Sequence, residues 1–294
     1  MKFKSIILTM VCGVIALQTA HAEEAKVEAA WTLGGDISFN LNQTSFSNWA
    51  AGGENAFGGN ILFNYSAKYK QDKHIWDNRI ELAYGINNTE TTGSRKTSDK
   101  IYLSSLYGYE LKKNLYFSGL FSFQSQFTEG YTYDDDSNET LVSTFMAPGY
   151  LTLGCGLTWT PKEWFTATLT PATWRETFVL DTDLSDSGSY GVDAGAHTLT
   201  EIGANLQMVV EKGIMENVKL YTRLTLFSDY LENPQNVDVN WEVQLTMNIN
   251  KWLSASVTTN MIYDDNINIL KDNDSYGPAL QFKEALGIGL QFKL

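Results

Sequence analysis

The chain has 294 residues, a formal net charge of −13 at pH 7, and aromatic side chains at 13% of its positions. A chain this acidic repels the phosphate backbone, so we expect no binding of DNA or RNA. Beyond residue 22 no segment approaches 18 consecutive apolar residues, which argues against a transmembrane helix there.

The first 22 residues have the pattern of a secretory signal peptide. Lys2 and Lys4 precede an apolar run from Ile6 to Leu17, and the small-residue pattern Ala-His-Ala at 20–22 follows. This order is typical of a cleaved export signal, and the apolar run is too short for a membrane anchor. After cleavage Cys155 is the only thiol left, so we expect no intrachain disulfide.

Alternation of apolar and polar residues then runs along the rest of the chain. Residues 237–249 follow it for thirteen positions without a fault, which is typical of a strand with two different faces. Helical periodicity is absent after residue 22. Twelve such segments are predicted, at 31–43, 57–70, 76–87, 100–111, 115–127, 150–160, 164–174, 197–211, 218–228, 237–249, 252–264 and 278–294.

The lengths of these segments and of their links indicate a membrane barrel. Most segments are longer than soluble strands and match the roughly 9–11 residues that a tilted strand needs to cross a bilayer. Links after the even-numbered segments are short, and the others are longer and polar. We therefore predict an all-β, transmembrane, antiparallel up-and-down β-barrel of about 12 strands with both termini periplasmic. The expected divisions are a signal peptide at 1–22, a short periplasmic segment at 23–30 and one barrel domain at 31–294.

Aromatic residues and the C-terminal segment support this prediction. On the apolar face we expect one aromatic girdle near the short links, formed by Tyr69, Trp76, Tyr107, Tyr109, Trp159, Phe165 and Phe292. A second girdle is expected near the long links, formed by Phe127, Tyr150, Trp241, Tyr263 and Phe282. The last segment, "KEALGIGLQFKL", is apolar at every second position up to Leu294. It resembles the C-terminal strand by which bacterial outer-membrane barrels are recognised for assembly.

The alternate, polar positions are expected to line the barrel interior. They include Arg223 and Glu201, and near the outer ends of three consecutive segments they include four acidic residues. Those residues are Asp229, Asp238, Glu242 and Asp264. Carboxylates crowded at a pore mouth could select cations or bind Ca²⁺, whereas the alternative is a solvated acidic rim. We favour the rim, and we predict no metal site.

No pattern for catalysis is found in the sequence. His197 and Glu201 share a face of one segment, but four residues separate them by about 13 Å, too far for a hydrogen bond. Linear hydrolase and metalloprotease motifs are missing. We therefore expect no enzymatic activity and no cofactor, and we interpret His197 as a polar residue of the rim.

The stretch "QTSFSNWAAGGENAFGGN" links the first two segments and is predicted to be a structured outer loop. Gly52 and Gly53 permit positive φ angles, and Asn48 and Asn55 can bond neighbouring backbone. Trp49 either enters the interior or lies against lipid. The stretch "GYTYDDDSNE" at 130–139 resembles a Ca²⁺ loop but lacks the glycine and glutamate such loops need, so we interpret it as a mobile outer loop.

Several motifs resemble one known family. They are "SFSNWAAGGEN", "APGYLTLGCGLTWTP", "LTPATW", "GSYGVDAGA", "NVKLYTRLTLFSDYLENPQNVDVNWEVQLTMNINKWLSASV" and "NMIYDDNI". Together they resemble the Bacteroidetes outer-membrane β-barrel family catalogued as a domain of unknown function. The resemblance implies an integral protein of a Gram-negative outer membrane, and it carries over no catalytic or binding residue.

The function expected from the sequence is a pore, or a transport-associated protein, for small polar solutes. The first alternative is a structural or surface-interaction barrel with a plugged lumen, and an outer-membrane hydrolase is a more distant one. The expected partners are outer-membrane lipids and, through the C-terminal strand, the barrel-assembly machinery. We expect a monomer in the outer membrane. The alternation of apolar and polar residues does not decide whether the lumen is open or plugged, because the width of the lumen depends on how the inward side chains meet.

Overall fold

The structure, a computed structural model, describes residues 30–46, 54–134, 138–270 and 275–294. Twelve strands form the barrel and match the twelve predicted segments in order. They are β1 (Trp31–Thr44), β2 (Ala56–Gln71), β3 (His74–Thr89), β4 (Gly93–Lys112), β5 (Leu115–Ser125), β8 (Gly149–Lys162), β9 (Phe165–Phe178), β10 (Thr198–Met215), β11 (Val218–Asp229), β12 (Asp238–Asn248), β13 (Leu253–Tyr263) and β16 (Gln281–Lys293).

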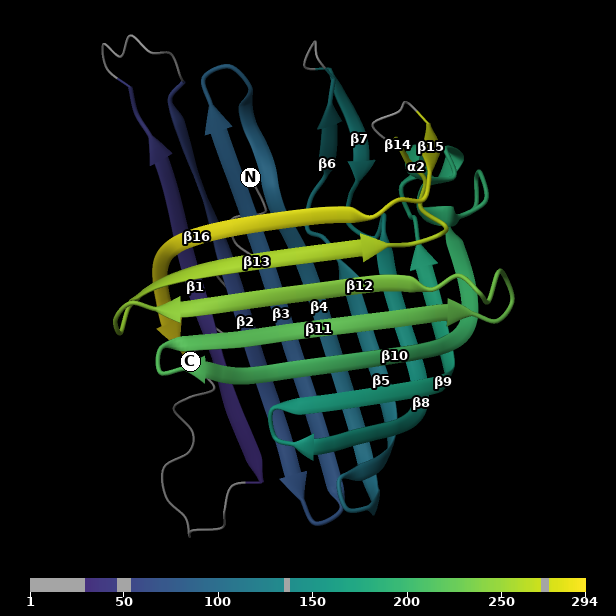
Figure 1. Ribbon diagram of the computed structural model, residues 1–294. Helices are drawn as coiled ribbons and strands as arrows, with labels where there is room; N and C mark the ends of the chain where they lie inside the picture. The colour runs from purple at the N-terminus through teal and green to yellow at the C-terminus, as the bar shows by residue number, and fades with distance from the viewer. Residues whose placement is uncertain (1–29, 47–53, 135–137, 271–274) are drawn as a thin grey trace, which may run out of the picture. The chain divides into compact units, whose positions relative to one another are not determined.

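The strands close into one barrel in which each strand pairs with its neighbours in the order β1-β16-β13-β12-β11-β10-β9-β8-β5-β4-β3-β2 (Figure 1). All pairs are antiparallel, so the predicted fold class is confirmed. The ladder that closes the ring is the shortest. Five residue pairs join β1 to β16, whereas fourteen join β1 to β2.

The links alternate in length as predicted with one exception, since only residues 90–92 join β3 to β4 where a long link was expected. Turns of two residues connect β2 to β3 and β4 to β5, and their positive φ angles, 52° at Asp72 and 64° at Asn114, suit tight hairpins. Because Trp31 pairs with Tyr69 and Lys293 pairs with Asp36, β1 begins and β16 ends at this short-turn end of the barrel. The opposite end carries the long links.

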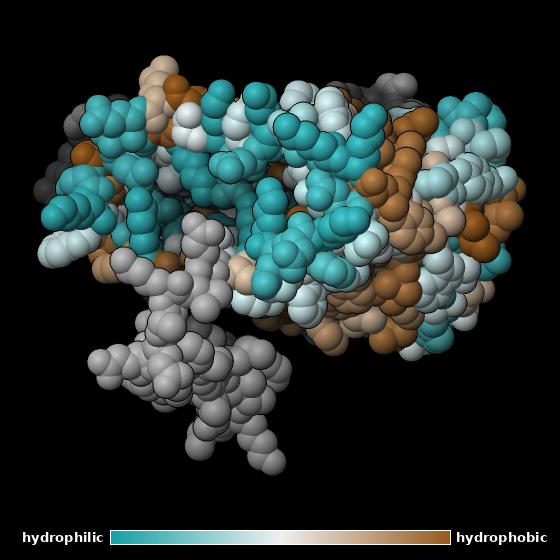
Figure 2. All heavy atoms as spheres, turned by 90° about the horizontal axis from the view of Figure 1, so that it is seen from below, coloured by the Kyte–Doolittle hydropathy of each residue, from teal (hydrophilic) through white to brown (hydrophobic). Residues whose placement is uncertain are grey.

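The apolar positions of the strands face outward. On β16 the exposed fractions of Leu286, Ile288, Leu290 and Phe292 are 71%, 56%, 48% and 43%. Figure 2 shows the surface from below, with hydrophilic side chains gathered on one part of it and a hydrophobic area beside them. This arrangement is the inverse of a soluble protein, whose apolar residues fill the interior. In the part of the chain that the structure describes, no helix is long and apolar enough to cross a membrane.

Aromatic residues gather at both ends of the outer wall. At the short-turn end Trp76, Tyr107 and Trp159 are 41%, 46% and 51% exposed, and at the other end Trp241 and Phe282 are 41% and 59% exposed. One aromatic prediction is wrong. Tyr150 has the opposite parity to the outward Leu153, which places it on the inner face of β8.

Several strand boundaries differ from the prediction, most of all at the start of β4 and at the ends of β9 and β10, the last of which runs to Met215 and not to residue 211. β4 begins at Gly93 and not near residue 100, since Ser94 and Arg95 still pair with the end of β3. β9 runs on to Phe178 after an irregularity in its pairing with β10. The extension of β4 is polar on both faces, so no period marks it in the sequence.

The long-loop end carries structure that the sequence did not predict. β6 (Gly130–Tyr133) pairs antiparallel with β7 (Glu139–Ser143), in a stretch that the sequence analysis interprets as a mobile loop. β14 (Ile269–Leu270) and β15 (Tyr276–Gly277) pair beyond β13. Two short helical turns, α2 (Thr182–Asp186) and the 3₁₀ turn η1 (Ser189–Gly191), follow β9 in a stretch where the sequence shows no helical periodicity.

These helical turns form part of a folded unit, called here the cap, which comprises residues 139–147 and 179–199. Its small apolar core contains Ala147, Val179, Leu184 and Val192, all at most 5% exposed. Asp181 caps α2 by accepting a hydrogen bond from the Leu184 backbone N–H at 3.1 Å. A helix of five residues is too short for the helical repeat of apolar residues to be recognised in a sequence.

Candidate functional site

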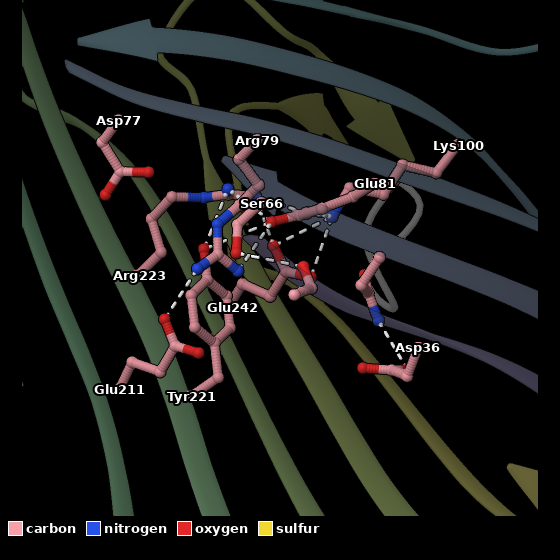
Figure 3. A network of polar contacts seen from close by, with 12 residues as sticks. Asp36, Ser66, Asp77, Arg79, Glu81, Lys100, Glu211, Tyr221, Arg223 and Glu242 are labelled. Atoms are coloured by element: carbon pink, nitrogen blue, oxygen red, sulfur yellow. Dashed lines mark hydrogen bonds and ion pairs between the residues drawn. The ribbon is translucent and has the colours of Figure 1, made fainter. Parts of the chain in front are cut away.

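Four charged side chains meet in the middle of the barrel and are called here the central network: Glu81 of β3, Lys100 of β4, Arg223 of β11 and Glu242 of β12 (Figure 3). The Lys100 Nζ lies 2.6 Å from Glu81 Oε2 and 2.8 Å from Glu242 Oε1. The Arg223 guanidinium donates to Glu81 Oε1 at 2.9 Å and to Glu242 Oε2 at 2.6 Å. Each cation therefore joins both carboxylates.

The central network crosses the barrel from wall to wall. In the closed strand order, five strands separate β3 from β11 in either direction, and five separate β4 from β12. Both the Glu81–Arg223 and the Lys100–Glu242 contacts thus join opposite strands. Side chains that touch across the axis obstruct the lumen at this level.

Tyrosine rings pack around these charges. Tyr102 and Tyr221 are 5% and 6% exposed, and Arg223 Cζ lies 3.8 Å from the centroid of the Tyr102 ring. The Tyr221 hydroxyl donates to Glu81 Oε1 at 3.2 Å. With Glu81 itself 4% exposed, the carboxylate is held by charged and hydroxyl donors and not by bulk water. Ions buried in this way cost desolvation energy that only well-placed partners offset.

A second group of charges lies nearer the short-turn end and is called the short-turn cluster: Lys68, Arg79, Glu211 and Lys219. Glu211 of β10 receives all three cations, with distances of 3.1 Å to Lys68 Nζ, 2.8 Å to Arg79 Nη2 and 2.7 Å to Lys219 Nζ. Arg79 also lies 3.8 Å from Glu81, so the two groups are continuous. Because β2 and β10 are opposite strands, the Lys68–Glu211 contact crosses the barrel as well.

A cavity of about 390 Å³ opens beside the short-turn cluster. Lys68, Glu211 and Lys219 line it together with Lys293, the last residue of β16. Turn residues such as Glu163 and Glu216 form its rim. The short-turn end therefore offers a charged recess that reaches inward to the first cross-barrel contacts.

A third group lies toward the long-loop end. The guanidinium of Arg175, on β9, forms an ion pair with Glu201 and lies 2.6 Å from Asp238 Oδ2. The Phe227 ring lies under it, 4.0 Å from Arg175 Cζ. Asn266, in the link after β13, donates to Glu201 at 3.4 Å. This link therefore reaches into the upper part of the barrel.

The cap touches the same link. Gly191 has a φ of 83°, and a Cβ placed there would lie 2.9 Å from the Asn266 side chain. No residue but glycine fits this approach without strain. The cap and the link after β13 are thus in direct contact at the long-loop end, above Glu201.

The four acidic residues predicted to crowd the mouth do not form one site. Asp238 pairs with Arg175, and Glu242 belongs to the central network. Asp229 accepts from the backbone N–H groups of Ile202 and Leu231 at 3.3 and 3.0 Å. Asp264 accepts from the Asn266 backbone N–H at 2.9 Å. Asp238 and Asp264 stay near each other, since the Asp265 backbone N–H donates to Asp238 Oδ1 at 3.3 Å, whereas cations hold Glu242 and backbone donors hold Asp229 elsewhere.

The other predicted positions lie at the long-loop end. The His197 ring is exposed and its Nδ1 lies 2.9 Å from the Val179 carbonyl oxygen, while Glu201 binds Arg175 and not His197. Asn55 accepts from the Phe46 backbone N–H at 2.6 Å and donates to Glu90 at 2.7 Å. The four remaining loop candidates lie outside the described residues: Asn48, Trp49, Gly52 and Gly53.

Sequence reasoning missed two cations that organise the interior. Lys100 is the first residue of the predicted segment at 100–111 and shares the inward parity of Tyr102, so the alternation was sufficient to find it. Arg175 could not be found in this way. Pro171 and Ala172 interrupt the alternation of β9, where the register with β10 shifts between Gly203 and Asn205. The face on which Arg175 lies is decided by that bulge.

A closed antiparallel barrel with an apolar outer wall and a charged interior defines the class of transmembrane β-barrels. Within the chain, residues 41–131 match a family described as "Protein of unknown function (DUF3078)". The matched part includes the motif at 45–55 quoted above. No curated protein matches the chain in sequence.

Among solved structures, the chain is similar to the translocator domain of the autotransporter NalP from Neisseria meningitidis, with 10% identity, a TM-score of 0.36 and coverage of 98% of this chain and 95% of that one. An outer membrane channel from Pseudomonas putida F1 is 11% identical, with a TM-score of 0.39 and coverage of 93% and 100%. The NanC porin is 9% identical, with a TM-score of 0.37 and coverage of 88% and 99%. The class of this chain rests on its own strand order and surface.

Proposed function

We propose that this protein is an outer-membrane barrel whose lumen is held closed by the central network and which passes small ions when that network rearranges. The observation that carries the proposal is the pair of contacts that joins opposite walls, Glu81 to Arg223 and Lys100 to Glu242. The sequence left an open pore and a plugged barrel as alternatives. Side chains that meet across the axis count against a permanently open pore.

The chemistry of the network supports a pathway for ions and not only a filling of the barrel. A buried ion pair adds little net stability compared with apolar residues of similar size, so stability does not explain a charged interior. Lys100 and Arg223 each contact both Glu81 and Glu242, so a cation can lose one acceptor and keep the other. Such exchangeable partners lower the cost of opening.

Location and partners belong to the same proposal. The apolar outer wall and the export signal expected at residues 1–22 support a position in the outer membrane of a Gram-negative bacterium, and the motif resemblance supports the Bacteroidetes as its source. The protein acts there as a monomer in contact with membrane lipids, is inserted by the barrel-assembly machinery through β16, and has no enzymatic activity.

A second candidate is a plugged structural or surface-interaction barrel. It is favoured by the contact of the cap with the Asn266 link, which covers part of the long-loop end. In this case the central network is a permanent brace, and the folded cap presents a surface to the outside.

Conductance in planar lipid bilayers separates the two functions. We expect small, infrequent currents for the unmodified protein and a several-fold higher mean conductance for the double variant Lys100→Ala/Glu242→Ala, because one of the two cross-barrel contacts of the central network is then lost. The control is Lys251→Ala/Glu232→Ala, which removes one charge of each sign outside the network. Heat-dependent migration in detergent gels verifies that each variant is folded. Absence of current from both proteins would establish the plugged barrel.

A further inference from the structure

We infer that the cavity at the short-turn end is a binding site for a small oxyanion, a carboxylate or phosphate group. The inference does not depend on conduction, because the cavity lies on the accessible side of the first cross-barrel contacts. It rests on the arrangement of cations around the 390 Å³ recess.

The inner lining of the cavity is cationic. Four lysines line it, Lys68, Lys212, Lys219 and Lys293, and Glu211 is the one acidic residue of a strand among them. They come from four different strands, β2, β10, β11 and β16, so the barrel itself places them around one space. The other acidic residues of the lining, Glu163 and Glu216, are exposed residues of the two-residue turns at the rim.

Glu211 does not neutralise these cations. It already receives Arg79 at 2.8 Å in addition to Lys68 and Lys219, while Lys68 has a second, longer contact with Asp77 at 3.9 Å. Over the whole lining, four lysines stand against three glutamates, which leaves an excess of one positive charge. The excess is local and opposite in sign to the formal charge of −13 on the whole chain. An acidic protein that collects cations at one recess creates a potential that attracts anions there.

Lys293 contributes a cation without an acidic partner. Within the described residues it forms no ion pair, although its cross-strand neighbour on β1 is Asp36. The Asp36 carboxylate instead accepts a hydrogen bond from Asn64 at 3.4 Å. An ammonium group in this position can donate to a ligand without first giving up an ion pair.

The size and chemistry of the recess limit its ligand. A volume of about 390 Å³ lies within the range of small-molecule sites. The lysine ammonium groups act as point charges with rotatable donors, which suits the oxyanions of phosphate and carboxylate. Asn217 and Asn248 also line the cavity, and an asparagine amide supplies neutral donors. The ligand class is therefore a small organic or inorganic anion that reaches the barrel from its short-turn side.

Calorimetric titration tests this inference with protein in a neutral maltoside detergent and with two probes, inorganic phosphate and succinate. We expect saturable binding of at least one probe. The double variant Lys68→Gln/Lys293→Gln is expected to weaken it by about tenfold or more, the loss of one charge-assisted hydrogen bond being worth about 1.4 kcal/mol. Lys251→Gln, in the turn between β12 and β13 and outside the cavity lining, is the matched control and is expected to bind like the unmodified protein.

The same oxyanion could belong to a lipid headgroup. Native mass spectrometry after addition of phosphatidylglycerol distinguishes this source, since a lipid site retains the lipid and loses it in the Lys68→Gln/Lys293→Gln variant. Either result supports the site. If neither probe nor lipid binds, or if the double variant and the Lys251→Gln control bind equally, the inference is overturned. Neither outcome depends on conductance, so failure here is distinct from failure of the proposed ion pathway.

Discussion

Arg223 shows how one side chain connects distant parts of this barrel. It is 7% exposed, contacts Glu81 from the opposite wall and Glu242 from the adjacent strand, and covers the Tyr102 ring. Because Arg223 alternates with apolar residues along its segment, the sequence alone predicted that its side chain lies in the interior. Its partners could not be predicted, because contacts across the axis depend on which strands lie opposite each other and on the height of each residue.

Replacing Arg223 by methionine is expected to lower the free energy of unfolding by about 3–5 kcal/mol, because Glu81 remains buried without its main partner. Adding Glu81→Gln is expected to recover most of the loss, since the uncompensated charge is then removed. Urea unfolding in lipid vesicles measures both values. A double variant no more stable than Arg223→Met alone would contradict this account of the network.

Tyr190 provides a pH-dependent contact outside the barrel wall. Burial raises the pKa of its hydroxyl to about 12, and the hydroxyl donates to the Val142 carbonyl oxygen at 2.5 Å. Because the pKa in the folded cap is above the ordinary value near 10, its contribution is complete below pH 10 and is lost as pH rises through 12. We expect faster hydrogen exchange in residues 182–199 above pH 10.

Tyr190→Phe removes the titrating group and is the control for this effect. The variant loses about 1 kcal/mol of cap stability with the hydrogen bond. Its exchange rates, after correction for the intrinsic effect of pH, should then stay constant between pH 10 and 12. An unchanged pH response in the variant would assign the effect to another group.

At the scale of elements, the cap is a separate small core attached to a barrel. Val179 is fully buried in it, whereas the adjacent Leu180 is 53% exposed. The barrel strands were predicted almost completely because every strand repeats the same two-faced pattern. The cap was missed because its four core residues are spread over two loops and follow no period.

Val179→Ala is expected to cost about 2 kcal/mol within the cap and to make the link between β9 and β10 sensitive to protease. Leu180→Ala is the matched control, since its side chain is exposed and its loss leaves no cavity. Limited proteolysis followed by mass spectrometry reads out the cleavage. The barrel itself should keep its heat-dependent migration in both variants, because its ladders are untouched. Equal cleavage of the two variants would show that the apolar core does not hold the cap.

At the scale of the whole molecule, the outer wall distinguishes a membrane barrel from a soluble one. Leu286 lies near the middle of the β13–β16 ladder and is 71% exposed, and Leu41 is 69% exposed near the long-loop end of β1. In a bilayer, Leu286→Arg is expected to cost about 2–4 kcal/mol, whereas Leu41→Arg costs about 0–1 kcal/mol near the interface.

Unfolding in phospholipid vesicles measures this difference, with detergent micelles as a second medium. In water both positions would tolerate arginine about equally, since their exposed fractions are nearly the same. Equal costs in vesicles would therefore contradict the membrane-spanning assignment. This test of the fold is independent of any current through the lumen.

The short ladder between β1 and β16 has a consequence for the order of events during insertion into the membrane. β16 is the last of the twelve barrel strands along the chain, so the ring cannot close before β16 reaches β1. Until then β1 and β13 each have an edge whose backbone groups lack partners, which lipid does not tolerate. Only five residue pairs seal the ring once β16 arrives, so this seam is the place where a finished barrel would separate first.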